Sequence, residues 1–146
     1  MSEPGDRLFP ARPILAVSTA VFRDGRVLLA RRTRAPWAGA FSLPGGVVEL
    51  GETLEAAAAR ELSEEVGVEA EFAGFVGHVQ PISREGERVR AHYVIVVLAA
   101  HWRAGEPGRS AEVDEVVWVD PRDPGDRPTT PELPALLARA ADVIGR

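Results

Sequence analysis

The sequence predicts an α/β protein in which a mixed β-sheet is sandwiched between helices. Strand-like segments occur on both sides of one helical segment, and a second helical segment closes the chain. The chain has 146 residues, of which 45% are hydrophobic, so its length suits one domain with its own core. We therefore expect a single domain over residues 1–146, with a flexible N-terminus over residues 1–12.

The first two strands are predicted as a hairpin. Residues 14–22 are apolar and β-rich, Asp24-Gly25 is a two-residue turn signal, and residues 26–30 return as the second strand. Residues 41–46 form a short extended piece that breaks at Pro44-Gly45-Gly46. The two glycines there permit positive φ angles and let the backbone approach a ligand closely.

A helix is predicted between Thr53 and about Val66. Thr53 can cap the first turn, and Gly67 suits the C-terminal exit. The stripe that we expect to face the core repeats every four residues and consists of Leu54, Ala58, Leu62 and Val66.

The second half of the chain predicts three more strands and a terminal helix. Residues 69–79 read as a strand, followed by a polar loop over 81–87. Residues 92–100 are mostly apolar, which predicts a central strand in a sheet that is covered on both faces. A charged loop (103–114), a last strand (116–119) and an amphipathic helix (131–144) complete the prediction.

Three glutamates share one face of the predicted central helix. Glu61, Glu64 and Glu65 lie three and four residues apart, so their side chains are neighbours. At ~4 Å and an effective dielectric constant of about 20, each pair of these charges costs roughly 4 kcal/mol. The cluster must therefore stay in solvent, take up protons or hold a cation. Oxygen ligands without Cys or His favour Mg²⁺ or Mn²⁺ over Zn²⁺.

A longer pattern surrounds these carboxylates and runs from Gly46 to Val68. It reads G-x5-E-x7-R-E-L-x-E-E-x-G-V and resembles an unbroken Nudix box. Its fixed residues would match by chance at a given start on the order of once in 10⁹, which disfavours the alternative of a solvated acidic helix face. The resemblance implies a Nudix fold and a metal-dependent hydrolase of a nucleoside diphosphate that is linked to another group.

The resemblance also implies roles for residues within the box. It implies metal ligands at Glu61, Glu64, Glu65 and the carbonyl of Gly46, with Mg²⁺ as the ion and Mn²⁺ as an alternative. Arg60 is expected to pair with one of the acids and to set its orientation. The isopentenyl diphosphate isomerase branch of the superfamily uses a cysteine, and this chain has none, so the sequence argues against that branch.

Outside the box, the loop before the last strand carries Glu112 and Glu115. Parts of the family supply a further glutamate from this loop, and either residue could add a metal ligand or act as general base. A general base must reach the attacking water, and Glu61 and Glu112 are the two candidates. Glu64 is expected to be essential for turnover.

Residues before the box are candidates for substrate binding. Arg31, Arg32 and Arg34 lie at the end of the predicted hairpin, and the planar guanidinium groups of one or two of them, with Arg31 and Arg32 preferred, would suit phosphate oxygens. The alternative for all three is a solvated loop. Phe41 stands where relatives often carry a large aromatic residue, and its alternative is a core position.

The whole-chain pattern resembles small bacterial and archaeal ADP-ribose pyrophosphatases, with RVLLARR before the box and HYVIVVL after it. This favours ADP-ribose or a nucleotide sugar as the substrate. That group often has a proline further past the box than Pro81, which lies thirteen residues after Val68, so this signature is not met. The alternatives are a (deoxy)nucleoside triphosphate pyrophosphohydrolase and a Nudix domain that binds a nucleotide metabolite as a sensor without cleaving it.

Charge and hydropathy limit the other partners. The formal net charge of −5 gives no positive footprint for nucleic acid or for an anionic membrane. Residues 1–13 have no apolar run, and the run Tyr93 to Ala100 is too short to span a bilayer. We expect a cytoplasmic protein whose partner is a small nucleoside diphosphate derivative. The family resemblance is compatible with a homodimer.

Overall fold

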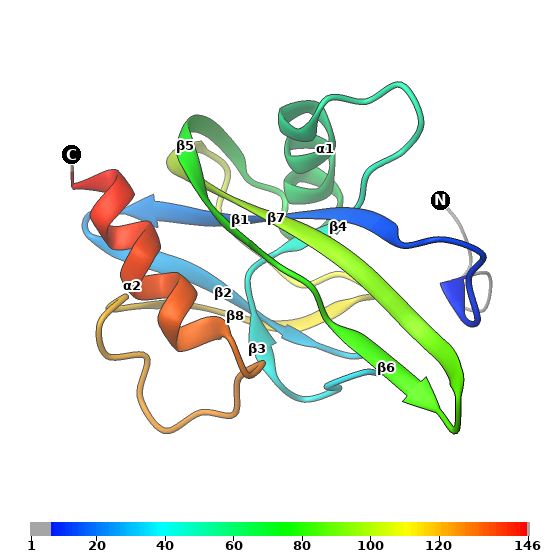
Figure 1. Cartoon of the computed structure of the whole chain (residues 1–146). Coiled ribbons are helices and arrows are strands. Elements are labelled where there is room, and N and C mark those ends of the chain that lie inside the picture. The colour runs from blue at the N-terminus through cyan, green and yellow to red at the C-terminus, as the bar shows by residue number, and fades with distance from the viewer. Residues whose placement is uncertain (1–6, 146) are drawn as a thin grey trace.

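Residues 7–145 of the chain are described by a computed structural model (Figure 1). The strands are β1 (Ile14–Arg23), β2 (Arg26–Arg32), β3 (Phe41–Ser42), β4 (Gly45–Val47), β5 (Glu69–Val79), β6 (Ile82–Glu85), β7 (Arg88–Ala104) and β8 (Val113–Val119). The helices are α1 (Leu54–Val66) and α2 (Leu133–Ile144). Neither of these two helices is long and apolar enough to cross a membrane.

The strands form a mixed sheet with β1 at its centre. β1 runs parallel to β7 from Ile14 to Phe22, and β7 pairs antiparallel with β5. β1 pairs with β2 only next to their turn, and β2 then diverges to pair with β3 and β8. β4 takes the stretch of β1 around Val17 instead. The predicted mixed sheet is confirmed, and so is the central position of the strand predicted over residues 92–100, because β7 lies between β1 and β5.

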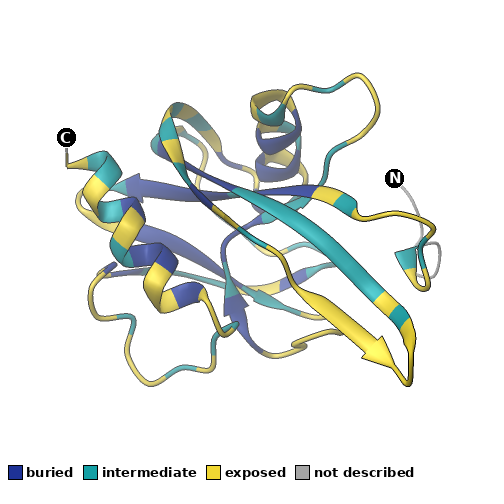
Figure 2. Ribbon diagram, in the orientation of Figure 1, coloured by how far each residue is buried: buried dark blue, intermediate teal, exposed yellow. Residues whose placement is uncertain are grey.

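Helices α1 and α2 cover opposite faces of this sheet (Figure 1). Neighbouring residues of β2 alternate between them, since Leu28 packs in the core beneath α1 and Leu29 in the core beneath α2. β7 does the same, with Leu98 on the α1 side and Val97 on the α2 side. Figure 2 shows the buried residues concentrated where the strands pass between the two helices. The predicted sandwich is therefore confirmed.

Helix α1 begins and ends where its capping residues allow. The Thr53 hydroxyl accepts a hydrogen bond from the Ala56 N–H at 3.1 Å, which satisfies one free donor of the first turn. Gly67 adopts a left-handed conformation (φ 72°, ψ 32°), and its N–H donates to the Ser63 carbonyl. This exit turns the chain directly into β5.

Two segments differ from the sequence prediction. Residues 82–85, predicted as part of a polar loop, form β6 and pair with an extended start of β7 across a turn at Gly86-Glu87. The hairpin has few buried side chains, so it carries no hydrophobic pattern to reveal it. The charged loop is correspondingly shorter than predicted, because β7 continues to Ala104 and β8 begins at Val113.

The N-terminal region predicted as flexible is described only in part. Residues 1–6 lie outside the described residues. Phe9 contacts the β6–β7 hairpin, because its N–H donates to the Arg90 carbonyl at 2.8 Å and the Arg88 guanidinium lies 4.0 Å from its ring centroid. The segment before β1 is therefore held against the start of β7.

Candidate active site

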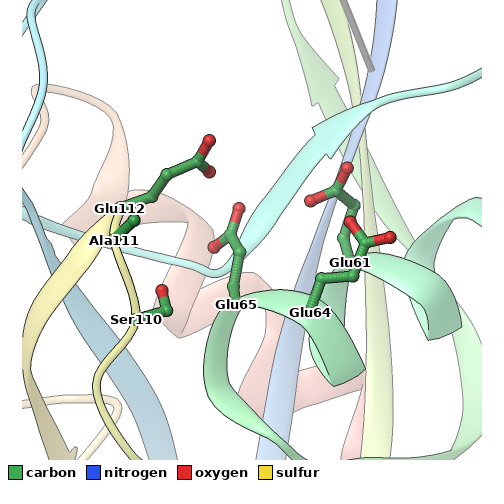
Figure 3. Close-up of a pocket in the computed structure, with 6 residues that line it drawn as sticks. All are labelled: Glu61, Glu64, Glu65, Ser110, Ala111 and Glu112. Atoms are coloured by element: carbon green, nitrogen blue, oxygen red, sulfur yellow. The ribbon is translucent and has the colours of Figure 1, made fainter.

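The carboxylate pocket is a cavity of ≈ 140 Å³ between helix α1 and the loop before β8 (Figure 3). We call residues 105–112 the Glu112 loop. Three glutamates reach the pocket from α1, and three residues reach it from the loop; the full lining is Glu61, Glu64, Glu65, Ser110, Ala111 and Glu112. The structure thus brings Glu61, Glu64, Glu65 and Glu112 together, although Glu112 lies more than forty positions after the others. Glu115, the other acidic candidate of this region, lies in β8, pairs with Arg31 and does not line the pocket.

Glu61 is part of the buried stripe of α1 and not only at its edge, as predicted, since 1% of its surface is exposed. Arg60 compensates its charge, with Nη1 donating to Glu61 Oε1 at 2.8 Å. Burial raises the pKa of Glu61, and the hydrogen bond and charge of Arg60 partly oppose that shift. Arg60 therefore pairs with an acid of the box, as the sequence predicted, and that acid is buried.

The Arg60 guanidinium is itself fixed on its other sides. Its Nε and Nη2 donate to the two carboxylate oxygens of Glu52, both at 2.8 Å, and Nη2 also donates to the Val47 carbonyl at 3.0 Å. This paired contact holds the pKa of Glu52 down at about 2. Glu52 and Arg60, two positions of the box, thus form a hydrogen-bonded support for Glu61.

Glu65 is a second pocket acid with a raised pKa. Burial, followed by the negative charges of Glu61 and Glu112, raises its pKa to about 8. A hydrogen bond from the Gly45 backbone and the positive charge of Arg32 oppose this rise. A group in this position strongly favours a proton or a cation, which is the electrostatic behaviour predicted for the cluster.

Gly45 and Gly46 serve close packing and not a turn with positive φ, which corrects one part of the sequence prediction. Both lie in strand β4, and neither has a positive φ. A Cβ on Gly45 would overlap the Val17 carbonyl, and a Cβ on Gly46 would overlap the Glu61 carboxylate. Only glycine lets β4 lie between β1 and the buried acid.

The Glu112 loop is held by backbone contacts along its length. The Gly108 N–H donates to the Val66 carbonyl at the end of α1, at 3.0 Å. Ser110 and Val113 exchange backbone hydrogen bonds of 2.8 and 3.3 Å. On the opposite side, the Thr33 N–H donates to the Glu112 carbonyl at 3.2 Å. The loop therefore bridges α1 and the segment that follows β2.

None of the predicted substrate-binding residues lines the carboxylate pocket. Arg31 and Phe41 face each other across β2 and β3, and the Arg31 guanidinium lies 6.0 Å from the Phe41 ring centroid. Arg31 pairs with Asp114 at 2.6 Å and with Glu115 at 3.0 Å, so its guanidinium is engaged by β8. The Arg32 Nε donates to the Pro36 carbonyl at 3.0 Å, and this side chain is the one whose charge acts on Glu65. Phe41 is buried in the core beneath α2, which favours its alternative as a core residue.

Ser110 is a pocket residue that sequence reasoning missed. Its hydroxyl oxygen is buried, and it has no hydrogen-bond partner among the described residues. A lone serine in a charged loop has no spacing or periodicity that would mark it in a sequence. Its place follows only from the fold of the Glu112 loop over α1 (Figure 3).

The pocket has the donor chemistry of a site for a hard divalent cation. Four carboxylates border one small cavity, and their mutual repulsion favours a positive charge between them. Within residues 7–145, no group of three or more His, Cys, Asp or Glu side chains is already positioned to hold a metal ion. The donors fit such an ion by type and location, and side-chain rotation would have to bring their oxygens together.

Comparison with known proteins agrees with this architecture. A family model described as the NUDIX domain matches residues 12–140. The MutT NUDIX hydrolase from Burkholderia pseudomallei has a TM-score of 0.77 and 34% identity, and the match covers 88% of this chain and 98% of that chain.

Two relatives have different named substrates. A protein of Mycobacterium tuberculosis named putative 8-oxo-dGTP diphosphatase 2 is 36% identical over 140 residues, which are 90% of this chain and 96% of that protein. The ADP-ribose pyrophosphatase of Methanocaldococcus jannaschii is 33% identical over 102 residues, which are 68% of this chain and 60% of that enzyme. This chain thus matches less than two thirds of the archaeal enzyme's length. The chain belongs to the Nudix family, and it is a hydrolase that acts on phosphoric anhydride bonds.

Proposed function

We propose that this hydrolase cleaves a nucleoside triphosphate to a nucleoside monophosphate and pyrophosphate in a Mg²⁺-dependent reaction. The observation that carries the proposal is the carboxylate pocket, in which four acids from two separate elements border one cavity. Such a site repels a bare polyphosphate, so a cation must accompany the substrate. The hydrolysis of a phosphoric anhydride and the carboxylate oxygens of the pocket therefore both support a reaction that depends on a divalent cation.

The cation would be held by Glu61, Glu64, Glu65 and the carbonyl of Gly46. Bound there, it would supply positive charge for the phosphate oxygens and make water more acidic. Arg60 keeps the Glu61 carboxylate in one orientation through its 2.8 Å hydrogen bond. The side chains of this chain thus position the charges, and the β4 backbone limits the space around them.

Glu112 is the better placed of the two candidate general bases. Both side chains border the pocket, but the Glu61 carboxylate is almost excluded from solvent, whereas the Glu112 side chain is 34% exposed and accessible to an attacking water. In the proposed step, the water oxygen forms a bond to phosphorus while the bond from phosphorus to the bridging oxygen breaks. Glu112 accepts the proton from that water.

The choice of a triphosphate rests on the extent of the similarities. The relative named for 8-oxo-dGTP matches nearly the whole of both chains, and so does the MutT hydrolase of known structure. The relative named for ADP-ribose matches 68% of this chain. The sequence pattern favoured ADP-ribose over a nucleoside triphosphate. The greater extent of the similarity to the triphosphate-named relative supports the opposite order, and ADP-ribose becomes the second candidate substrate.

A small substrate panel tests the proposal. The protein is assayed with Mg²⁺ against dGTP, 8-oxo-dGTP, CTP and ADP-ribose, and pyrophosphate and AMP release are measured separately. We expect kcat/KM for the best triphosphate to exceed that for ADP-ribose by at least about tenfold. A higher kcat/KM for ADP-ribose than for every triphosphate would make ADP-ribose the substrate and reject the triphosphate proposal. Nucleotide binding with no product would support the sensor alternative and reject both.

A further inference from the structure

The Glu112 carboxylate is held by a segment that lies outside the Nudix box. This segment is Thr33-Arg34, which follows β2 directly. The Arg34 Nη1 lies 3.2 Å from Glu112 Oε1 and donates a hydrogen bond to it. Thr33 holds the backbone of the same loop at two successive residues.

The two Thr33 contacts fix the main chain at the base of the glutamate. The Thr33 N–H donates to the Glu112 carbonyl at 3.2 Å, and the Thr33 hydroxyl donates to the Ala111 carbonyl at 2.9 Å. The contacts on the α1 side of the loop are made further back, where Gly108 reaches the Val66 carbonyl. Thr33 therefore fixes the backbone position from which the Glu112 side chain extends to the pocket.

Arg34 acts on the side chain itself. The Glu112 carboxylate borders a pocket that already contains the charges of Glu61, Glu64 and Glu65. Repulsion from these acids favours rotation of Glu112 toward solvent. Arg34, from the segment after β2, supplies a positive charge 3.2 Å from that carboxylate. Its attraction limits the positions that Glu112 can adopt at the pocket edge.

The exposure of the ion pair argues against a role in stability. The Arg34 and Glu112 side chains are 51% and 34% exposed. Ion pairs as exposed as this contribute little to the free energy of folding, because water and salt screen them. A contact of this kind between two loops has its main effect on local geometry, and a small displacement of a reacting group has a large effect on rate.

We propose that Thr33 and Arg34 are positioning residues that hold Glu112 at the edge of the carboxylate pocket in the orientation needed for proton transfer. The proposal rests on the proposed role of Glu112 and deepens it. Neither residue has to contact the substrate in this arrangement. Arg34 therefore affects turnover through Glu112 and leaves substrate binding nearly unchanged.

The main test is a double-mutant cycle between Arg34→Ala and Glu112→Gln, with Thr33→Val as a second variant. The substrate is the nucleotide of the panel that the wild-type protein hydrolyses fastest. We expect Arg34→Ala to lower kcat by about tenfold or more with KM changed less than about twofold. In the Glu112→Gln background the same substitution should have no further effect. Arg34→Lys, which keeps the charge, should recover part of the loss.

The matched control is Arg122→Ala. Arg122 forms a similarly exposed ion pair with Asp142 of α2, at 2.7 Å, on the other side of the sheet. This variant should keep wild-type kcat and KM. If Arg34→Ala raises KM instead, and its effect adds to that of Glu112→Gln, Arg34 contacts the substrate phosphates directly and the positioning role is wrong.

A second measurement does not depend on catalysis. Hydrogen–deuterium exchange is followed for residues 105–113 in the wild-type protein, Thr33→Val and Arg34→Ala. We expect at least about threefold faster exchange in this loop in both variants, with the exchange of α2 unchanged. Unchanged loop exchange would overturn the proposal even if no nucleotide in the panel is hydrolysed. If the wild-type protein hydrolyses no nucleotide of the panel but the loop exchanges faster in both variants, the proposed function alone is rejected.

Discussion

Helices α1 and α2 cover opposite faces of one sheet, yet they pack against it in different ways. The buried residues of α2 are all apolar, namely Leu133, Leu136, Leu137 and Ala140. The buried residues of α1 include Glu61, an acid with an elevated pKa, between small and aliphatic neighbours. One face thus contains an ordinary core, and the other combines a core with a charged site.

The difference shows how a functional charge is accommodated in a small domain. Burying a carboxylate is unfavourable unless hydrogen bonds and opposite charge compensate it. Around Glu61 the compensation comes from Arg60, which Glu52 fixes in turn, and from the absence of a side chain at Gly46. The α2 face needs no such arrangement. We therefore expect substitutions on the two faces to separate activity from stability.

The largest expected effect is on activity and comes from Glu64→Gln. Half of the Glu64 side chain is exposed, so the change should leave the fold intact while it removes a charged oxygen donor from the pocket. We expect kcat to fall by about a hundredfold or more at saturating Mg²⁺, with an unchanged melting temperature. Glu55→Gln on the exposed first turn of α1 is the control. Retention of more than about a tenth of wild-type activity would contradict the assignment of Glu64 as a ligand.

The next largest effect is on stability and comes from Leu137→Ala on the α2 face. Leu137 is fully buried, so its truncation should lower the free energy of unfolding by about 2–5 kcal/mol. Urea denaturation measures this loss. Below the unfolding transition, kcat per folded molecule should match the wild type. A large loss of kcat in the fully folded protein would show that the two faces are more strongly coupled than their packing indicates.

Gly46→Ala should affect both properties moderately. The added methyl group would overlap the Glu61 carboxylate, so either the acid or β4 must shift. We expect a loss of about 1–3 kcal/mol in stability and about a tenfold fall in kcat. Gly108→Ala is the matched control, because a Cβ there meets no atom within 4 Å. Equal behaviour of the two variants would refute the close-packing explanation for Gly46.

The smallest effect concerns the pH dependence of stability in the presence of a chelator. The folded-state pKa of Glu65 is about 8, well above that of an unfolded glutamate, so the folded protein binds the extra proton between these values. Stability should therefore fall as pH rises from about 5 to about 8. Glu65→Gln should reduce this fall and raise the melting temperature at pH 8 by several degrees. Identical pH dependence of the melting temperature in the wild-type protein and Glu65→Gln would contradict the raised pKa of Glu65.

The sequence was sufficient for the features that depend on local spacing. Helix α1 with its Thr53 cap, its Gly67 exit and its shared face of acids follows from residues within one short stretch. The identification of the Nudix family and the pairing of Arg60 with an acid follow from the same stretch. These contacts could be predicted because every partner except Val47, Glu49 and Glu52 lies within one helical turn.

Features that depend on distant segments were less predictable. The depth of Glu61 depends on how closely β4 approaches, and the contacts of Arg31 with β8 depend on a strand pairing across more than eighty residues. The β6–β7 hairpin was missed because it buries little and shows no hydrophobic pattern. The turn residue Gly86, with φ 62°, was the local signal that could have indicated it.

The parallel pairing of β1 with β7 also has a consequence for how this protein folds during synthesis. Ile14 pairs with Tyr93, about 80 residues later, so the centre of the sheet cannot close until most of the chain has left the ribosome. Contacts of such long range slow folding, because the entropy of the intervening chain must be lost before they stabilise the product. Until then β1 exposes both of its apolar faces, and the nascent chain in that interval is the species most exposed to aggregation.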